Sequence, residues 1–596
     1  MTPGETDNSR RVGGLRLALI AASCAAVIAI LSSIAVLVGR TLEADPDPAH
    51  ANYNLLLQGF ESGHLNLLKE VPAGFARLPD PYDPVANGPY RFHPYRLHDM
   101  SYYRGKFYLY FGATPVLLAY WPWKALTGHF LGNEGAAIGF AAIGFLAATG
   151  ILLMTWRRFF PATGAGVVAA CALALGLADG VPVLLQRPGV CEIPICCAHA
   201  LVMLAILAIL LSILVPARRG AWLAAASLVY GLAVASRPSL LFGAVILAVP
   251  LALQPFSPGA GGRQRLAAAA VIPISLVIAG MLAYNVLRFG SPLEFGQHYQ
   301  LLVGSYRGAE PTFSLRYLLY NLRVNFIEPV HLAGRFPFVA DISAGPMPRG
   351  HAAIESPFGV LVNTPVTLLA LAAPLGIRAL LPTDRPGLRG LTWAAALAFA
   401  VPALTLCLFW GACSRYEVDF LPPLVLLAVL GILGLESALA ERPAARRITR
   451  TGWGCLLAIS IAFNLCASLQ HYPEQSFEHG RLMLEEGRLP EAIADNTEAQ
   501  RFQPKYTSAR DNLGVALARS GRADQAVAQF RLALALDSKG DSITCYNLAL
   551  FLAQRGETRE PIELLRRALT LDPKFTPAAA ALRRLEGISA AATPVK

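Results

Sequence analysis

The chain has few charged residues for its length. Asp, Glu, Lys and Arg make up 15% of its 596 residues, whereas hydrophobic residues make up 55%. A soluble domain carries about 25% charged residues, so this balance argues against a water-soluble fold for most of the chain. It predicts a protein that is largely embedded in a membrane.

Two kinds of motif are missing as well. Neither GxxxxGK[ST] nor a strand-flanked GxGxxG occurs, which argues against a nucleotide-driven or soluble NAD-dependent activity. The ten cysteines have no repeated spacing, and most lie within or beside apolar segments, where small buried residues are expected. Cys191, Cys196, Cys197 and His199 are clustered, but their spacing is not a common zinc pattern. A metal at this cluster is therefore disfavoured, and whether the protein needs a divalent cation stays open.

The formal net charge of +11 comes mainly from arginines in short loops beside apolar segments. Loops of this kind stay on the cytoplasmic side of a bilayer. We therefore interpret these arginines as determinants of topology and expect no nucleic-acid partner. The six clusters are Arg10/Arg11/Arg16, Arg157/Arg158, Arg218/Arg219, Arg263/Arg265, Arg378/Arg385/Arg389 and Arg442/Arg446/Arg447/Arg450.

The sequence predicts an all-α, polytopic helical membrane protein. Segments long and apolar enough to cross about 30 Å of hydrocarbon occur near 17–38, 135–155, 163–179, 193–215, 221–236, 239–254, 266–287, 360–380, 390–410, 418–440 and 452–468. If the N-terminal residues 1–16 are cytoplasmic, these eleven spans place every arginine cluster inside. If a twelfth apolar stretch, 109–127, also crossed the membrane, every later loop would lie on the opposite side. We interpret it as an interfacial helix with Tyr120, Trp121 and Trp123 at the headgroup level.

This topology leaves three regions on the outer side: the loops 39–134 and 288–359, and the tail after 469. Ten of the eleven histidines lie in these regions. Any chemistry is therefore expected on the outer face.

The tail, 471–590, contains an internal repeat. Gly480, Gly514 and Ala549 are 34 and 35 residues apart, and so are Gly487, Gly521 and Gly556. A period near 34 with small residues at helix crossings is the tetratricopeptide (TPR) pattern. The tail is predicted to be an α-solenoid of about three TPR units that binds a protein or peptide partner.

Several outer residues are candidates for chemistry. Asp45 and Asp47 directly follow the first span, where a carboxylate could take a proton from a hydroxyl, although solvated loop acids are the commoner case. Arg237 and Arg415 are predicted at the outer ends of spans, where they either bind a phosphate or extend to the interface. Further candidates for substrate contact are His298, Lys106 and Tyr103. His98 and Asp99 are neighbours in a loop expected to be extended, so their side chains are predicted to point apart.

The membrane part resembles the GT-C superfamily of polytopic glycosyltransferases. The resemblance covers roughly residues 15–470 and is closest to the branch of protein mannosyltransferases and aminoarabinose transferases. It rests on the acid after the first span and on short motifs. These are NYNLLLQGFESGHLNL (52–67), YRLHDMSYYRGKFYLYFG (95–112), ASRPSLL (235–241), NVLRFGSPLEFGQHYQL (285–301) and SRYEVDFLPPLVLLA (414–428). The chain departs from the usual adjacent Asp-Glu pair, with Asp-Pro-Asp-Pro in its place.

The resemblance implies a bacterial inner-membrane enzyme that moves a sugar from a polyprenyl-phosphate carrier to a hydroxyl of a lipid, glycan or protein. The base would be Asp45 or Asp47, with Asp47 favoured by its distance to the Ser62-Gly63 turn. Two other interpretations stay open. One is an enzyme like the O-antigen ligases or polymerases, and the other is a non-enzymatic scaffold whose spans anchor the repeats. A transporter is disfavoured, because neither duplicated halves nor charged residues in mid-span are evident.

Overall fold

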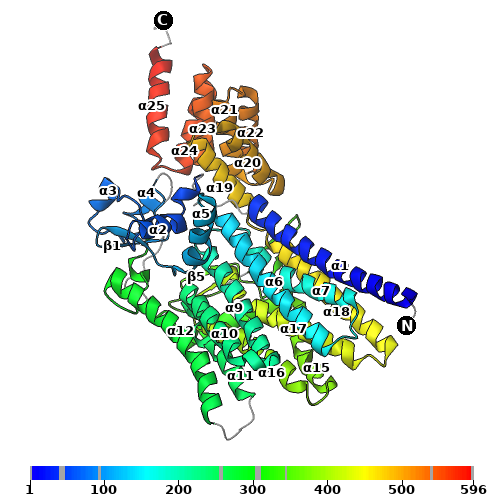
Figure 1. Ribbon diagram of the computed structural model, residues 1–596. Coiled ribbons are helices and arrows are strands. Elements are labelled where there is room, and N and C mark those ends of the chain that lie inside the picture. Colours follow the sequence, from blue (N-terminus) through cyan, green and yellow to red (C-terminus); the bar gives the residue numbers. More distant parts are fainter. Residues whose placement is uncertain are drawn as a thin grey trace. The chain divides into compact units, whose positions relative to one another are not determined.

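The computed structural model describes residues 3–38, 47–91, 95–253, 260–301, 311–342, 345–536 and 541–591. The chain divides into two compact units, one built chiefly from the residues up to Leu469 and one from Gln470 onward. Both units are mainly helical, and the described residues of the first also form three two-stranded sheets (Figure 1).

Eight helices within the described ranges are long and apolar enough to cross a membrane. The chain is therefore a multi-pass membrane protein. These helices are α1 (Pro3–Ser33, continued by the π-helical turn Ile34–Val38), α6 (Asn133–Phe159), α7 (Ala165–Leu177) with α8 (Val181–Leu184), α9 (Glu192–Leu214), α12 (Ala260–Phe289), α16 (Arg385–Cys407), α17 (Leu421–Ala438) and α18 (Pro443–Ala467).

The other three predicted spans are not among these eight. The stretch 221–236 is α10 (Arg219–Ser236). The stretch 239–254 is the 3-10 helix η5 (Pro238–Ala248) with α11 (Val249–Ala252), and 360–380 begins with α14 (Val360–Asn363) and continues as η9 (Pro365–Ala372) with α15 (Ala373–Ala379). The last two are apolar but fall below the length of the eight, so the number eleven stays a prediction.

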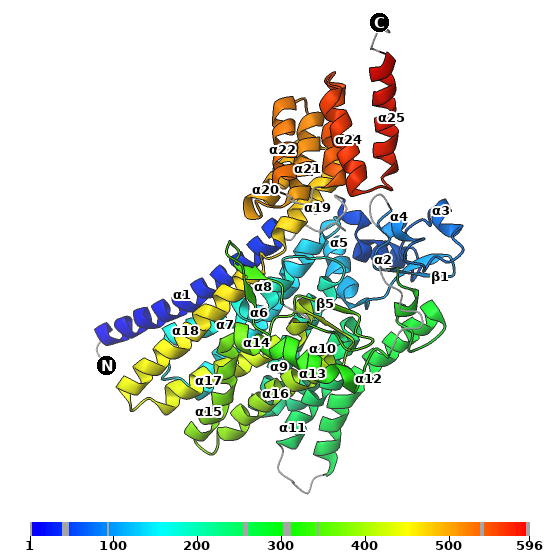
Figure 2. The same cartoon turned by 180° about the vertical axis from the view of Figure 1, so that it is seen from behind.

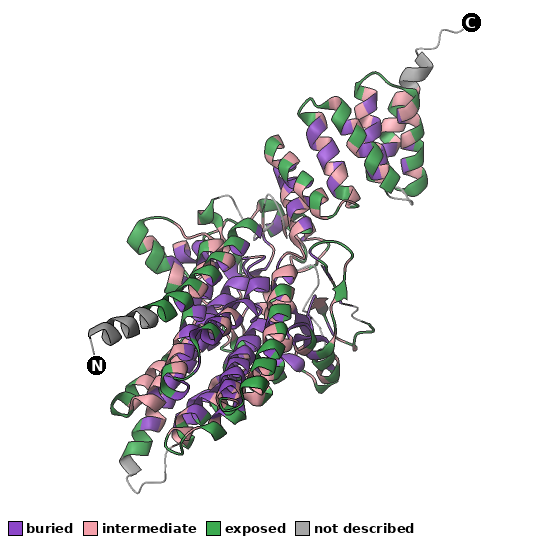
Figure 3. Ribbon diagram, turned by 90° about the vertical axis from the view of Figure 1, so that its right-hand side faces the viewer, coloured by how far each residue is buried: buried purple, intermediate pink, exposed green. Residues whose placement is uncertain are grey.

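Helix α9 lies in the middle of the first unit. It packs against α6, α10 and α16, and α10 in turn packs against α12. A helix that is apolar on all sides is expected to be buried, and most α9 residues are buried. Figure 3 shows that buried residues gather on the inner helices of the first unit. Gly144 allows the close approach of α6, because a Cβ at this position would lie 2.4 Å from the His199 imidazole.

The segment between α1 and α6 folds into short elements. They are η2 (Pro48–His50), α2 (Asn52–Glu61), α3 (Ala73–Ala76), α4 (Gly88–Arg91), the hairpin β1 (Met100–Tyr103) and β2 (Lys106–Leu109), η3 (Val116–Tyr120) and α5 (Trp121–Thr127). The hairpin pairs Tyr103 with Lys106. In α5, Trp121 and Trp123 are 43% and 46% exposed, in keeping with an interfacial helix. Tyr120 differs from the expectation: it is buried, stacks on Tyr53 and donates to Asn133 Oδ1 at 2.7 Å.

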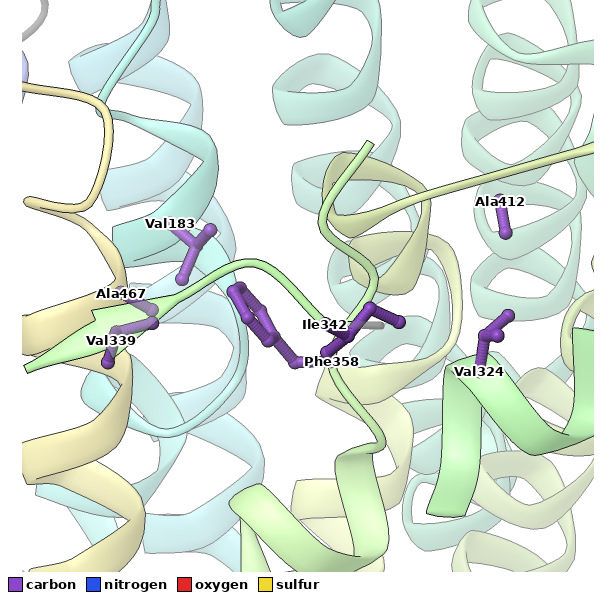
Figure 4. Packing of buried hydrophobic residues seen from close by; sticks show 7 residues of the cluster. All are labelled: Val183, Val324, Val339, Ile342, Phe358, Ala412 and Ala467. Carbon is purple, nitrogen blue, oxygen red and sulfur yellow. The ribbon is translucent and has the colours of Figure 1, made fainter. Parts of the chain in front are cut away.

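The segment between α12 and α16 is held to the helices by a small apolar cluster. Val339, Ile342 and Phe358 of this segment belong to one buried cluster with Val183 and Ala467. Figure 4 shows Val183 and Ala467 close together beside Val339. The elements of the segment are η6 (Gln297–Tyr299), η7 (Leu315–Tyr317), α13 (Leu318–Leu322), η8 (Arg323–Ile327), β3 (His331–Leu332), β4 (Val339–Ala340) and β5 (Ala353–Glu355) (Figure 2). Strand β5 pairs in parallel with β6 (Gly411–Cys413), which leads into η10 (Ser414–Asp419).

The second unit is a series of helix pairs. They are α19 (Tyr472–Glu485) with α20 (Leu489–Phe502), α21 (Thr507–Arg519) with α22 (Ala523–Leu536) and α23 (Ser542–Gln554) with α24 (Arg559–Leu571), followed by α25 (Thr576–Ala591). Small residues allow each pair to pack closely: a Cβ at Gly514 would lie 2.6 Å from the Phe530 ring. Ala492, Ala526 and Ala568 are fully buried. The predicted TPR-like region is therefore confirmed.

Candidate functional site

Two arginines that are distant in sequence meet at one aromatic ring. Arg237 lies between the end of α10 and Pro238, and Arg415 lies in η10. Their guanidinium carbons are 5.1 Å and 5.5 Å from the centroid of the Tyr416 ring. The structure thus brings together the two arginines that the sequence gives as candidates for phosphate binding.

Arg237 is paired with a buried carboxylate. Its Nη2 lies 2.7 Å from Asp419 Oδ2, and the two side chains are 13% and 1% exposed. Ser239 Oγ donates to the same oxygen at 3.2 Å. Burial alone would lower the pKa of Arg237, but the Asp419 carboxylate outweighs it, so the guanidinium stays charged. Because removing one partner would leave a buried charge, this pair fixes the position of Arg237.

Arg415 is paired with carboxylates from other elements. Its Nη1 donates to Glu355 Oε2 at the end of β5 and lies 3.8 Å from Glu192 Oε1 at the start of α9. Arg187 Nη1, in the turn before α9, lies 3.8 Å from Glu355 Oε1. Glu355 is therefore flanked by two arginines, and its side chain is 42% exposed.

The same turn of η10 contains a second buried acid. Glu417 Oε1 accepts from the Phe358 N–H at 2.9 Å, so it ties η10 to the segment that carries β5. Burial raises the pKa of the Glu417 carboxyl well above its usual range. Phe358 is itself held in the apolar cluster of Figure 4. Glu417 and Phe358 therefore place Glu355 beside Arg415.

An apolar cavity of about 310 Å³ lies next to Arg237. Ala235 and Pro238, on either side of Arg237 in sequence, line it. Its size is that of a small-ligand pocket. The other lining residues are Phe60, Leu65, Tyr110, Gly112, Ala113, Thr114, Leu117, Leu232, Val277, Gly280, Met281, Tyr284, Asn285, Arg288 and Phe295.

Gly112 forms part of one wall of this cavity. A Cβ at Gly112 would lie 1.7 Å from the Ala235 carbonyl oxygen, so only glycine lets the 110–114 segment approach α10 this closely. The approach brings Tyr110 within electrostatic range of Arg237. The cavity and the arginine site therefore share a wall.

Three other predicted residues lie around the β1–β2 hairpin. Tyr103 packs its ring on Tyr299 at 4.5 Å. His298, next to Tyr299, has its Nδ1 2.7 Å from Glu294 Oε2 and a side chain that is 69% exposed. Lys106 is exposed at the start of β2. These residues form a separate aromatic and charged surface beside the hairpin.

The structure describes only one of the two predicted catalytic bases. Asp47 is exposed and caps η2, with Oδ1 accepting from the Ala49 N–H at 2.9 Å. Asp45 lies outside the described residues. The role of either as a base therefore stays a prediction.

Asp99 is a buried acid that the sequence analysis considered only as a neighbour of His98. Its carboxylate accepts from Gln300 Nε2 at 2.8 Å and from the Cys191 thiol at 3.3 Å, and only 7% of the residue is exposed. His98 Nε2 lies 3.7 Å from Asp99 Oδ2, so the expectation that the two side chains point apart is wrong. The reason is that Asp99 has φ +61°, whereas that expectation assumed an extended loop.

Asp99 also links the hairpin to the arginine site. It directly precedes β1, and its partner Cys191 is near enough to Arg415 and Tyr416 to influence their pKa values. A strained, buried carboxylate in such a place is typical of functional sites. Within the described part of the chain, no three His, Cys, Asp or Glu side chains are grouped in a way that could hold a metal ion.

The comparisons with known proteins give a similarity only among solved structures. No protein-family model and no curated protein matches the chain. Among solved structures, the chain is similar to YrrB, described as a TPR protein with an unusual peptide-binding site, at 20% identity. The match covers 26% of this chain and 82% of that protein, with a TM-score of 0.18.

Proposed function

We propose that the first unit is an outer-face glycosyltransferase. It would move a sugar from a polyprenyl-phosphate donor to a hydroxyl of an envelope lipid, glycan or protein. The observation that carries this proposal is the meeting of Arg237 and Arg415 on Tyr416 beside an apolar cavity. A phosphate joined to an isoprenoid chain needs cations next to an apolar surface.

The reaction would be a single displacement. The acceptor oxygen attacks the anomeric carbon while the bond from that carbon to the phosphate oxygen breaks, which inverts the configuration. An aspartate, Asp47 or Asp45, takes the hydroxyl proton. Arg237 and Arg415 offset the charge of the departing phosphate at the membrane boundary, where a cation is worth more than in water.

The proposal includes the eleven-span topology, with a cytoplasmic N-terminus and a periplasmic tail. A 3-10 helix rises about 2.0 Å per residue and an α-helix about 1.5 Å. The fifteen residues of η5 and α11 therefore extend about 28 Å, and those of η9 and α15 about 26 Å. Both approach the thickness of the hydrocarbon layer, about 30 Å.

The proposal assigns the TPR-like tail the recruitment of an acceptor or of a partner protein. Stacked repeats present one continuous surface, which suits such a role. This part of the proposal is independent of the catalytic part.

Sugar transfer in proteoliposomes tests the catalytic part. Purified protein would receive a panel of radiolabelled polyprenyl-phosphate sugars and a membrane extract as acceptor. Asp45→Asn, Asp47→Asn and Asp99→Asn are compared with wild type, and Asp384→Asn, at a surface pair with Arg158, is the control. Loss of at least 100-fold in one of the first two variants would identify the base. Equal transfer in both would remove Asp45 and Asp47 from that role. If wild type transfers sugar from none of the donors, the result would favour the alternative of a non-enzymatic scaffold whose spans anchor the repeats.

A further inference from the structure

The two arginines of the site differ in how firmly their carboxylates are held. Asp419, the partner of Arg237, is 1% exposed. Glu355, the partner of Arg415, is 42% exposed and is the last residue of a three-residue strand. Moving Asp419 would leave the buried Arg237 guanidinium without its anion. Glu355, in contrast, is already partly exposed, so its carboxylate can become fully solvated at little cost. Only the second ion pair is therefore exchangeable.

Arg187 is a second arginine that faces the Glu355 carboxylate. It lies in the turn before α9, on a different element from Arg415, and its side chain is 41% exposed. One carboxylate oxygen of Glu355 faces Arg187 and the other faces Arg415. Two guanidinium groups from separate elements thus surround one exchangeable anionic group, an arrangement that also suits the oxygens of a phosphate.

We propose that Glu355 holds the place of the donor phosphate, and that Arg187 is a third phosphate-binding arginine. This inference rests on the proposed function. When the carrier binds, its phosphate replaces the Glu355 carboxylate between Arg187 and Arg415. Arg237 stays fixed by Asp419. No covalent bond changes in this exchange.

The site is then kept electrically balanced in both states. Without a ligand, Glu355 together with Glu192 offsets Arg415 close to the membrane, where an unpaired cation is expensive. With a ligand, the phosphate supplies the same charge and Glu355 is released to solvent. A neutral polyprenol cannot make this exchange, so the site selects the phosphorylated carrier.

Binding of a short-chain polyprenyl phosphate to the full-length protein in nanodiscs tests the exchange. Glu355→Gln removes the competing anion, so its Kd should fall about two- to fivefold, as expected from the strength of an exposed ion pair. Arg187→Gln should raise the Kd about tenfold, through the loss of a charged hydrogen bond. Glu328→Gln, which breaks a similar loop pair with Arg323 at 3.3 Å, is the matched control and should leave the Kd unchanged.

Two further arms identify what is recognised. Polyprenol should bind more weakly than polyprenyl phosphate and should not respond to Glu355→Gln. Inorganic phosphate should respond in the same direction but bind more weakly than the lipid. Thermal unfolding of each variant shows whether the fold is intact.

The inference is overturned if Glu355→Gln, folded like wild type, binds polyprenyl phosphate equally or more weakly, or if Arg187→Gln binds like wild type. In either case the proposed function would stand, because wild type still binds the carrier. If wild type binds no polyprenyl phosphate at all, the proposed function fails and this inference with it.

Discussion

At the scale of single residues, the charge of the site depends on the Arg237–Asp419 pair. Neither side chain is well exposed, so each compensates the charge of the other where there is little water. Sequence could predict Arg237 from its place at the end of a span. It could not predict Asp419, because the partner comes from a segment 182 residues away.

Asp419→Asn should therefore be strongly destabilising. It leaves the Arg237 charge buried without its anion, at a cost of about 3–5 kcal/mol. Thermal unfolding of the detergent-solubilised protein would measure this. Asp384→Asn removes the partner of the more exposed Arg158 and should cost at most about 1 kcal/mol. Equal effects of the two substitutions would contradict the structural role given to Asp419.

The buried carboxyl of Asp511, in α21, makes the stability of the tail depend on pH. Burial raises its pKa to about 6 from an ordinary value of 3.8. Between these values the folded state binds more protons than the unfolded state, so stability falls as pH rises. Above pH 6 the loss amounts to about 2–3 kcal/mol.

Asp511→Asn should remove this pH dependence and stabilise the tail at pH 7.5, because an amide oxygen can still accept from Asn547 Nδ2. Hydrogen exchange of α21 and α23 in the full-length protein, at pH 5 and pH 7.5, would measure it. Asp524→Asn, at a side chain that is 93% exposed, should change nothing. Faster exchange in Asp511→Asn at pH 7.5 would show that the charged form is stabilising.

At the scale of elements, the sequence predicts the long apolar helices and the repeats well, because both follow from regular patterns. Small residues 34–35 apart become helix crossings, as at Gly514 against Phe530. Irregular outer segments are different. The positive φ of Asp99 and the pairing of β5 with β6 depend on contacts distant in sequence, so no local pattern reports them.

Gly112→Ala tests the packing of one such segment. The added Cβ would meet the Ala235 carbonyl, so Tyr110 and the cavity wall should move away from α10 at a cost of about 1–3 kcal/mol. Binding of polyprenyl phosphate should weaken at the same time. Gly139→Ala in α6, where a Cβ would meet open space, should be neutral or stabilising. If Gly112→Ala has the stability and the binding affinity of wild type, the claim that the cavity and the arginine site share a wall would be contradicted.

At the scale of the whole molecule, function depends on which side of the membrane the two units face. In the proposed topology both the arginine site and the tail are periplasmic, as the positions of the arginine loops predict. The proposed chemistry requires the same side, because this topology puts the arginine site at the ends of spans opposite those loops.

Cysteine labelling tests this arrangement. Ser520→Cys in the tail and Ala444→Cys at the start of α18 both place a thiol at an exposed position. In right-side-out spheroplasts, a membrane-impermeant maleimide should label Ser520→Cys beyond the parent protein, and should label Ala444→Cys only after lysis. The reverse pattern would contradict the eleven-span topology.

The central claim is that the arginine pair stabilises the departing phosphate of a polyprenyl-phosphate donor. The most direct measurement is the rate of sugar transfer in proteoliposomes by wild type, Arg237→Gln, Arg415→Gln and the control Arg316→Gln, at an exposed residue of η7. The account predicts transfer by wild type and the control, with losses of about 100-fold or more in the two site variants, as when one stabilising donor is removed from a reacting anion. Undiminished transfer by folded Arg237→Gln and Arg415→Gln would contradict it.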